Sequence, residues 1–248
     1  MRMARFTNAV TLVRGLFNSR VRHAMIDTAK AMDVELLQEC PCCEKMVTLL
    51  PFGTPPSFGV ECPNCGSFNR HRLLWHHQKR ETIIRPEDNV LHFAAENVIR
   101  RLVEPIVKSY KRADILPQFG DIVLNIEHID LPESSFDTVI CSHVLEHVDD
   151  RKALSEIFRI LTPGGRLVAL IPIIDGWEKT YENPAITSER DRDLHFGQYD
   201  HIRYYGRDFR DRVKAAGFQL TEYGATGLEC ALYGLQRGEI VFVCTKPA

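Results

Sequence analysis

The stretch from residue 129 to residue 172, IDLPESSFDTVICSHVLEHVDDRKALSEIFRILTPGGRLVALIP, decides the fold. Two apolar runs of strand length, Thr138–Ser142 and Arg166–Pro172, lie on either side of a helical pattern. That pattern, Asp150–Leu161, follows an aspartate suited to N-capping and ends before the turn Pro163–Gly165. Strand, helix and strand in this order predict one βαβ unit of a parallel sheet.

The same alternation continues on both sides of this stretch, so we expect a Rossmann-like α/β fold with seven strands. A further helix is predicted from Gly206 to Ala216. The polar and aromatic stretch 174–205 is too long for a passive connection and predicts an insertion on the substrate side of the domain. The other expected strands are 90–94, 112–116, 122–126, 219–223 and 239–245.

Four of the eight cysteines form two close pairs, and their spacing is typical of a zinc ribbon. Cys40 and Cys43 are separated by eighteen residues from Cys62 and Cys65. Two thiolate pairs on tight turns can converge on one tetrahedral ion, and four sulfur ligands leave no open position, which indicates structural zinc. Two unrelated thiol clusters, or Cys42 replacing a member of the first pair, are the alternatives.

These patterns divide the chain into three parts. Residues 1–38 form an arginine-rich segment, in which Phe6, Val10, Val13 and Phe17 recur at the spacing of an amphipathic helix; binding of an anion, a lipid or a partner is the alternative. Residues 39–86 hold the zinc-ribbon-like module and a connecting helix, 69–82. Residues 87–248 form the α/β domain.

Composition narrows the class of protein. A net charge of −2 argues against a chain that coats nucleic acid through bulk charge. The longest uncharged apolar stretch is far shorter than the roughly 20 residues of a spanning helix, so no membrane span is expected. Cys141 and Cys244 lie inside apolar runs, where cysteine behaves as a small buried hydrophobe. Paired metal-ligand cysteines and apolar cysteines favour a reducing, cytoplasmic location.

In an open α/β sheet, ligands bind beyond the carboxyl ends of the strands, near the switch in strand order. Four places in the sequence meet this rule. They are Phe93, Ala94, Ala95 and Glu96 after the first strand; Asp114 and Ile115 after the second; Asn125 and Ile126 after the third; and Ser142 and His143 after the fourth.

The LP-x3-FD lead into the fourth strand and the PGG turn into the fifth resemble the central region of class I S-adenosylmethionine (SAM) dependent methyltransferases. The resemblance covers residue 90 to the C-terminus. It implies strand order 3-2-1-4-5-7-6 with an antiparallel last strand. It further implies that Asp114 binds the SAM ribose, Asn125 and Ile126 bind the adenine, and Ser142 and His143 face the methionine part.

The first loop departs from the family pattern. The family places a glycine-rich loop after the first strand, whereas the segment LHFAAEN, residues 91–97, contains no glycine. Alanine is small enough for a modified loop at this position.

Methyl transfer from a sulfonium requires alignment of acceptor and methyl group, and a hydroxyl acceptor also needs a base. The insertion supplies His201 as the first candidate, with Asp200 beside it, and His143 is the second candidate.

The leading hypothesis for the whole chain is a SAM-dependent methyltransferase acting on a small-molecule or saccharide acceptor. An RNA methyltransferase is the second, because the Arg70–Arg80 stretch is basic and adjoins the cysteine module. A non-catalytic scaffold with a degenerate methyltransferase fold is the third, favoured by the missing glycine loop.

Overall fold

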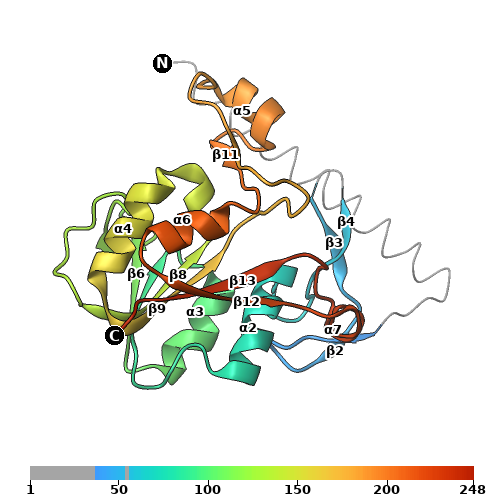
Figure 1. The fold of residues 1–248 in the computed structure, drawn as a ribbon. Helices are drawn as coiled ribbons and strands as arrows, with labels where there is room; N and C mark the ends of the chain where they lie inside the picture. Colours follow the sequence, from blue (N-terminus) through green and yellow to red (C-terminus); the bar gives the residue numbers. More distant parts are fainter. Residues whose placement is uncertain (1–36, 54–55) are drawn as a thin grey trace, which may run out of the picture. The chain divides into compact units, whose positions relative to one another are not determined.

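The computed structural model of the chain describes residues 37–53 and 56–248, which form two compact units (Figure 1). The smaller unit joins the described residues up to Arg72 with Thr226–Gln236, and the larger contains Leu73–Ala225 and Arg237–Ala248. The amphipathic helix expected around Phe6–Phe17 lies outside the described residues. The expected segment 87–248 therefore contributes residues 226–236 to the cysteine-containing unit, which the sequence patterns did not indicate.

The larger unit contains a seven-stranded sheet whose order is β7-β6-β5-β8-β9-β13-β12. Counted along the chain, this is the predicted order 3-2-1-4-5-7-6, and β13 runs antiparallel to both of its neighbours. The strands are β5 (Asn89–Phe93), β6 (Ser109–Asp114), β7 (Ile122–Val123), β8 (Phe136–Ser142), β9 (Leu161–Leu170), β12 (Gln219–Gly224) and β13 (Ile240–Thr245).

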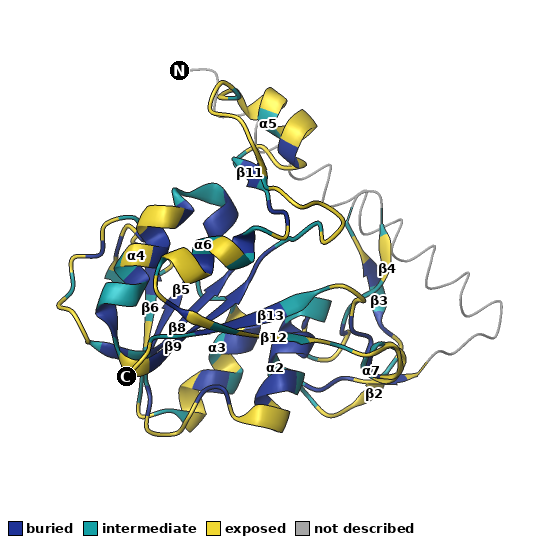
Figure 2. Cartoon of the chain, viewed as in Figure 1, coloured by how far each residue is buried: buried dark blue, intermediate teal, exposed yellow. Residues whose placement is uncertain are grey.

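Strand register builds the core of this sheet. Pairing places Phe93 beside Cys141, Cys141 beside Ala169, and Ala169 beside Phe242, so their side chains lie on one face. Cys244, next in that face, is fully buried like Cys141, which confirms that both act as small buried hydrophobes. The helix α4 (Asp150–Ile160) covers this face through Leu154 and Ile157, together with α6 (Phe209–Ala215) (Figure 2).

The remaining helices of the larger unit connect these strands. They are α3 (Asn97–Val103), the C-terminal part of α2 (Asn69–Glu81), and the 3-10 turns η1 (Glu104–Ile106) and η2 (Leu145–His147). Predicted and observed bounds of α4 agree closely because Asp149 caps the helix, its side chain accepting a hydrogen bond from the Lys152 N–H. The predicted third strand is cut short, since Asn125 turns the chain by accepting from the Glu127 N–H.

The predicted insertion has its own structure: β10 (Tyr181–Glu182), α5 (Glu189–Phe196) and β11 (Arg203–Tyr204). Arg203 ties it to the turn that follows β8. Its guanidinium is buried, donates to the carbonyls of Leu145 (2.8 Å) and Val148 (2.5 Å), and pairs with Glu182. Tyr205 adds a hydrogen bond from its hydroxyl to the same Leu145 carbonyl at 3.0 Å.

A buried carboxylate at the start of α4 completes this network. Asp150 accepts hydrogen bonds from the Tyr205 hydroxyl (2.9 Å) and from Arg212 of α6 (3.0 Å), and Arg203 approaches to 3.8 Å. Arg212 also pairs with Glu182 of the insertion at 2.9 Å. Two arginines and two carboxylates thus hold the insertion, α4 and α6 together, each buried charge having partners of opposite sign.

The strands β5 and β8 are each followed by a residue in the left-handed region. Ala94 has a φ of 47° and His143 a φ of 53°. This conformation suits glycine, and it costs other L-residues roughly 1–2 kcal/mol. Alanine, with the smallest side chain after glycine, therefore occupies the position where a glycine-rich loop was expected, and the backbone still makes the glycine-like turn.

The described part of the smaller unit contains two short hairpins, one helix and the first residues of α2. The hairpins are β1 (Gln38–Glu39) with β2 (Met46–Val47) and β3 (Leu50–Phe52) with β4 (Ser57–Glu61); the helix is α7 (Gly227–Tyr233). A capping box at Thr226 and Glu229 begins α7. Gln38 donates to the Ala231 carbonyl at 2.9 Å, which binds the returning segment to the first hairpin.

Arg72 is the central polar residue of this smaller unit. It is fully buried and donates to the carbonyls of Gly59, Val60, Ser67 and Gly234. These acceptors come from the second hairpin, the second cysteine turn and the segment after α7. One side chain therefore satisfies buried carbonyls that the sparse secondary structure of this unit leaves open.

Among the described residues, no helix is both long and apolar enough to cross a membrane.

Replacing Arg72 by methionine should lower the free energy of unfolding by about 3 kcal/mol or more, because several buried carbonyls would lose their donors. The matched control is Arg70→Met on the same helix, where the guanidinium stacks on Phe68 and a loss below about 1 kcal/mol is expected. Urea unfolding followed by circular dichroism measures both. Equal losses in the two variants would contradict the role given to Arg72.

Ala94→Val should lower stability by about 1–2 kcal/mol, because a β-branched residue is strained at positive φ. Ala94→Gly should be at least as stable as the unmodified chain. Because Ala94 is exposed, the larger side chain of valine does not clash with the core, and the comparison reports the backbone conformation alone. Thermal unfolding of the unmodified chain and the two variants measures their order of stability. A valine variant as stable as the glycine variant would show that the loop does not need a left-handed backbone conformation at residue 94.

Candidate active site

A cavity of about 460 Å³ opens at the carboxyl ends of β5, β6 and β8, where the strand order of the sheet reverses. Residues from all four predicted places line it. They are Phe93, Ala94, Asp114, Ile115, Asn125, Ile126 and His143. Ala95 lines an adjoining cavity of about 380 Å³ together with Ala94 and Asp114. Ser142 is buried and Glu96 precedes α3, and neither lines these two cavities.

Short local turns hold the polar groups of the cavity in place. Asp114 Oδ1 accepts from the Leu116 N–H at 2.9 Å, and Asn125 Oδ1 accepts from the Glu127 N–H at 2.9 Å. Each turn fixes one side-chain oxygen. Ile115 is 66% exposed and offers an apolar surface beside Asp114. A carboxylate, an amide and apolar walls are suited to a ligand with ribose hydroxyls and an adenine ring.

On the opposite side of the cavity, the insertion brings further polar residues to the turn after β8. His147 and Asp200 line the cavity, and their Nδ1 and Oδ2 atoms lie 3.4 Å apart. The rings of His147 and His201 meet edge to face at 4.6 Å between centroids. His143 Nδ1 lies 3.3 Å from Glu146 Oε1. The structure therefore brings the three predicted catalytic residues, His143, Asp200 and His201, to one place.

Backbone contacts fix this arrangement. The Ile202 N–H donates to the Glu146 carbonyl at 3.0 Å, directly after His201. His201 Nδ1 lies 3.2 Å from the Phe196 carbonyl, which is an acceptor only, so this nitrogen carries the proton. Burial lowers the pKa of His201 below its ordinary value, which favours the neutral imidazole.

Two residues of this cluster, Glu146 and His147, are not among the site residues that the sequence predicts. The signal was present in His143-x2-Glu146-His147, because a 3-10 turn places residues three apart on one side. What the sequence did not show is that His201, far along the chain, returns to the same turn.

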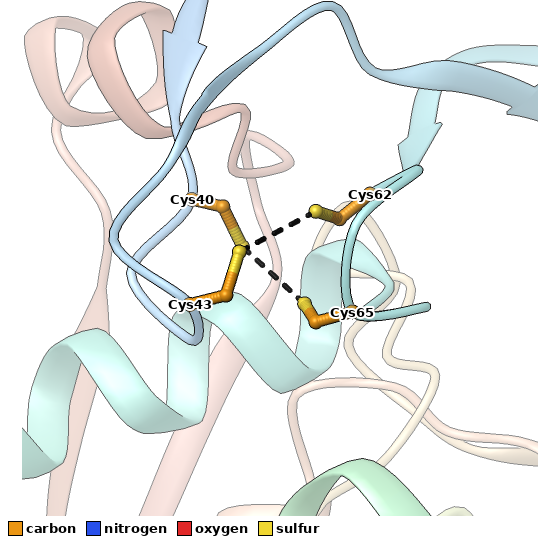
Figure 3. Close-up of side chains that lie close together, drawn as sticks. All are labelled: Cys40, Cys43, Cys62 and Cys65. Carbon is orange, nitrogen blue, oxygen red and sulfur yellow. Dashed lines mark hydrogen bonds between the residues drawn. The ribbon is translucent and has the colours of Figure 1, made fainter.

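The four predicted metal-ligating cysteines converge in the smaller unit, as Figure 3 shows. The sulfurs of Cys40 and Cys65 are 3.7 Å apart, and those of Cys43 and Cys62 are 3.8 Å apart. Four sulfurs at a zinc–sulfur distance of about 2.3 Å occupy tetrahedron corners that are about 3.8 Å apart. These two separations match those of a tetrahedral zinc site, all four sulfurs lie within 4.8 Å of one another, and Cys42 is not part of the cluster.

The two cysteine pairs lie on turns with the same hydrogen-bond pattern. In the first, the Glu44 N–H donates to the Cys40 carbonyl and the Cys40 N–H to the Lys45 carbonyl. In the second, the Gly66 N–H donates to the Cys62 carbonyl, and the Cys62 N–H to Ser67 in the same way. Both turns end in a left-handed residue, Glu44 with a φ of 58° and Gly66 with a φ of 72°. Repetition of one turn is what directs two thiols from each side at a common point.

The basic stretch after the cysteines is largely packed against the protein. Arg72, His71 and His77 are buried, and the His77 ring stacks on Tyr223 at 4.4 Å between centroids. The guanidinium of Arg80 lies over the same Tyr223 ring. These side chains serve packing, so the stretch does not present a continuous basic face.

A larger cavity of about 550 Å³ lies between α4 and α6. Charged residues such as Arg151 and Asp211 line it, and it contains none of the predicted site residues. Its position away from the carboxyl ends of the strands makes it the weaker candidate for catalysis despite its size.

Comparison with known proteins agrees with the fold. Residues 64–169 match the model of the methyltransferase domain family. The ubiquinone/menaquinone biosynthesis C-methyltransferase UbiE of Vibrio campbellii is 32% identical over 128 residues, which cover 46% of this chain and 49% of that protein. UbiE of Escherichia coli is 33% identical over 128 residues, covering 46% and 50%. The chain thus spans about half the length of the curated relatives it matches.

Two solved structures resemble the chain in fold. One is the methyltransferase of Haloferax volcanii in complex with the Trm112 methyltransferase activator, with a TM-score of 0.52 and 16% identity over 72% of this chain and 91% of that one. The other is the CurJ carbon methyltransferase, with a TM-score of 0.50 and 17% identity over 73% and 54%. The matched domain, the sequence relatives and the strand order together show that this chain has the fold of class I SAM-dependent methyltransferases and is similar to them in sequence over residues 64–169.

Proposed function

We propose that this chain binds SAM in the cavity at the carboxyl ends of β5, β6 and β8 and transfers its methyl group to a small-molecule acceptor, a saccharide included. The observation that carries the proposal is the cavity itself, because the residues lining it come from all four places where the sequence predicts cofactor contacts. Its volume of about 460 Å³ is in the range of small-ligand sites.

Each part of SAM has a suitable partner among the lining residues. The Asp114 carboxylate would accept hydrogen bonds from the ribose hydroxyls, with Oδ2 available beside the turn that uses Oδ1. Asn125, Ile126 and the exposed side chain of Ile115 would hold the adenine. The left-handed turn at Ala94 lets the chain pass close to the cofactor without a glycine.

The acceptor would enter from the insertion side. Arg192, Asp200 and His147 line the cavity there, opposite the residues assigned to SAM. The predicted roles of His201, His143 and Asp200 in moving a proton from a hydroxyl acceptor are part of this proposal. A small acceptor is also in keeping with UbiE, whose name describes a C-methyltransferase of quinone biosynthesis.

RNA is the less favoured acceptor. The hypothesis relied on the basic stretch Arg70–Arg80, yet Arg72 donates to carbonyls within the protein, and His77 and Arg80 pack on Tyr223. A protein that binds RNA through phosphate contacts needs such groups at its surface.

We also propose that Cys40, Cys43, Cys62 and Cys65 bind a structural zinc ion. Burial raises the pKa of the Cys62 and Cys65 thiols above the ordinary value of a cysteine. A divalent ion would stabilise the thiolates, and its binding free energy would contribute to folding of the small unit. No step of methyl transfer needs this ion, since four thiolates fill its coordination positions.

Calorimetry with SAM and with S-adenosylhomocysteine tests the proposed activity. The unmodified chain should bind both, and Asp114→Ala should weaken binding about 10- to 100-fold, since a hydrogen bond to a charged group contributes about 1.5–3 kcal/mol. Asp130→Ala, an exposed aspartate in the same domain, is the matched control and should bind as the unmodified chain does. Absence of binding by the unmodified chain at millimolar ligand would refute the proposal.

Metal analysis of the purified chain tests the zinc proposal. Cys62→Ser should lose one equivalent of zinc relative to the unmodified chain, and its small unit should become sensitive to proteolysis. Cys42→Ser removes a neighbouring thiol outside the cluster and should keep that equivalent. If Cys42→Ser lost the zinc and Cys62→Ser retained it, the ligand set would be wrong.

A further inference from the structure

We propose that Glu146, His147 and His201 form a second metal site, which holds a divalent cation at the edge of the proposed SAM cavity. One ligand atom from each of the three residues can be chosen so that all lie within 4.8 Å of one another. Three donors that bind one ion at about 2.1 Å lie about 3 to 3.6 Å from one another. Side-chain adjustments on the order of 1–2 Å therefore suffice to bring all three donors to one ion.

The buried carboxylate of Glu146 is the second, independent observation. Its side chain has no exposed surface, and neither of its oxygens accepts a hydrogen bond from any described residue. The group that can carry the opposite charge beside it is the imidazole of His143, whose Nδ1 lies 3.3 Å from Oε1. A buried carboxylate without donors is costly unless a cation or proton compensates it. Glu146 points into the histidine cluster, where a cation would supply that compensation.

Both histidines are oriented as metal ligands usually are. His201 Nδ1 donates to the Phe196 carbonyl, which leaves the lone pair of Nε2 as the metal donor. When the ion is bound, both ring nitrogens of His201 are engaged, so the proposed role in proton transfer would fall to His143. His147 Nδ1 lies 3.4 Å from Asp200 Oδ2, an arrangement in which the carboxylate orients the imidazole and leaves Nε2 as donor. Asp200 thus has a positioning role in the site.

The scaffold holds the three ligands at fixed positions. Glu146 and His147 share the turn η2, and the insertion that carries His201 is bound to that turn by the Ile202 N–H and by Arg203. The buried Asp150 network below η2 restrains the same segment from the α4 side. A site built in this way needs little reorganisation when the ion binds, which favours affinity.

The donor set determines which ion fits. Two imidazoles and one carboxylate suit Mn²⁺, Fe²⁺ or Zn²⁺, and three protein ligands leave coordination positions open. The cysteine cluster differs, because four thiolates select zinc and close its coordination shell. Mn²⁺, which prefers oxygen and imidazole donors, therefore distinguishes the two sites.

The position of the ion suggests what its open sites would bind. His147 and Asp200 line the cavity, so the cation would face the acceptor side of it. This step rests on the proposed function: an acceptor with a hydroxyl or enolate oxygen would be held by the metal next to the methyl group of SAM. Metal binding itself does not depend on that step.

Electron paramagnetic resonance of Mn²⁺ titrated into the zinc-loaded chain tests the site. The unmodified chain should remove one equivalent of free Mn²⁺ from solution. Glu146→Gln and His201→Ala should each weaken binding at least tenfold. His195→Ala, an exposed histidine of the same insertion whose Nδ1 contacts the Tyr181 hydroxyl, is the matched control and should bind Mn²⁺ unchanged.

Circular dichroism and S-adenosylhomocysteine calorimetry on the same variants show that each remains folded. Should Glu146→Gln fail to fold, the partly exposed His201 provides the deciding variant. The metal site is refuted if the unmodified chain binds no Mn²⁺ at millimolar concentration, or if both variants bind it as tightly as the control. Binding of Mn²⁺ without any binding of SAM would refute the proposed function and leave the metal site intact. Binding of SAM without any binding of Mn²⁺ would refute the metal site and leave the proposed function intact.

Discussion

The arrangement of the candidate active site depends on the buried guanidinium of Arg203. It donates to two carbonyls of the turn after β8 and pairs with Glu182, so one side chain binds the insertion to the sheet. Carbonyls at the end of a 3-10 turn lack partners within the turn, and the arginine supplies them. The Ile202 N–H and the Tyr205 hydroxyl add hydrogen bonds to carbonyls of the same turn, so residues 200–202 return to the carboxyl end of β8.

Two features of the site follow from this constraint. The insertion forms one wall of the cavity through Arg192 and Asp200, so a ligand is enclosed by the sheet and by the insertion. The same closure removes Glu146 from water by placing Ile202 and His201 over it. The buried carboxylate of Glu146 lowers the stability of the folded chain, because burial of a charge without a partner costs free energy. The proposed cation would compensate this buried charge.

The sequence predicted those parts of the fold that local patterns encode. The strand order followed from the family resemblance that the central block 129–172 carries, whereas α4 followed from its cap and apolar spacing, and the cysteine turns followed from their spacing. The role of residues 226–236 was not predictable, because it depends on Arg72 reaching the Gly234 carbonyl far along the chain. His201 was identified as a candidate, but its partners Glu146 and His147 became visible only through the packing of the insertion. The absence of glycine from the loop after β5 could be explained only from the structure, in which Ala94 adopts the left-handed backbone conformation that is typical of glycine.

Charge balance connects the two proposed ligands of the cavity. The sulfonium of SAM is positive, and a second cation nearby would repel it by several kcal/mol at the dielectric of a partly buried site. Glu146 and Asp200 together carry two negative charges, which offset a divalent ion, while His147 and His201 are neutral when they coordinate it. The metal cluster would then be neutral overall, and SAM could bind beside it. Without a metal, His143 Nδ1 lies 3.3 Å from Glu146 and His147 Nδ1 lies 3.4 Å from Asp200, and these contacts compensate the carboxylates only when the imidazoles are protonated.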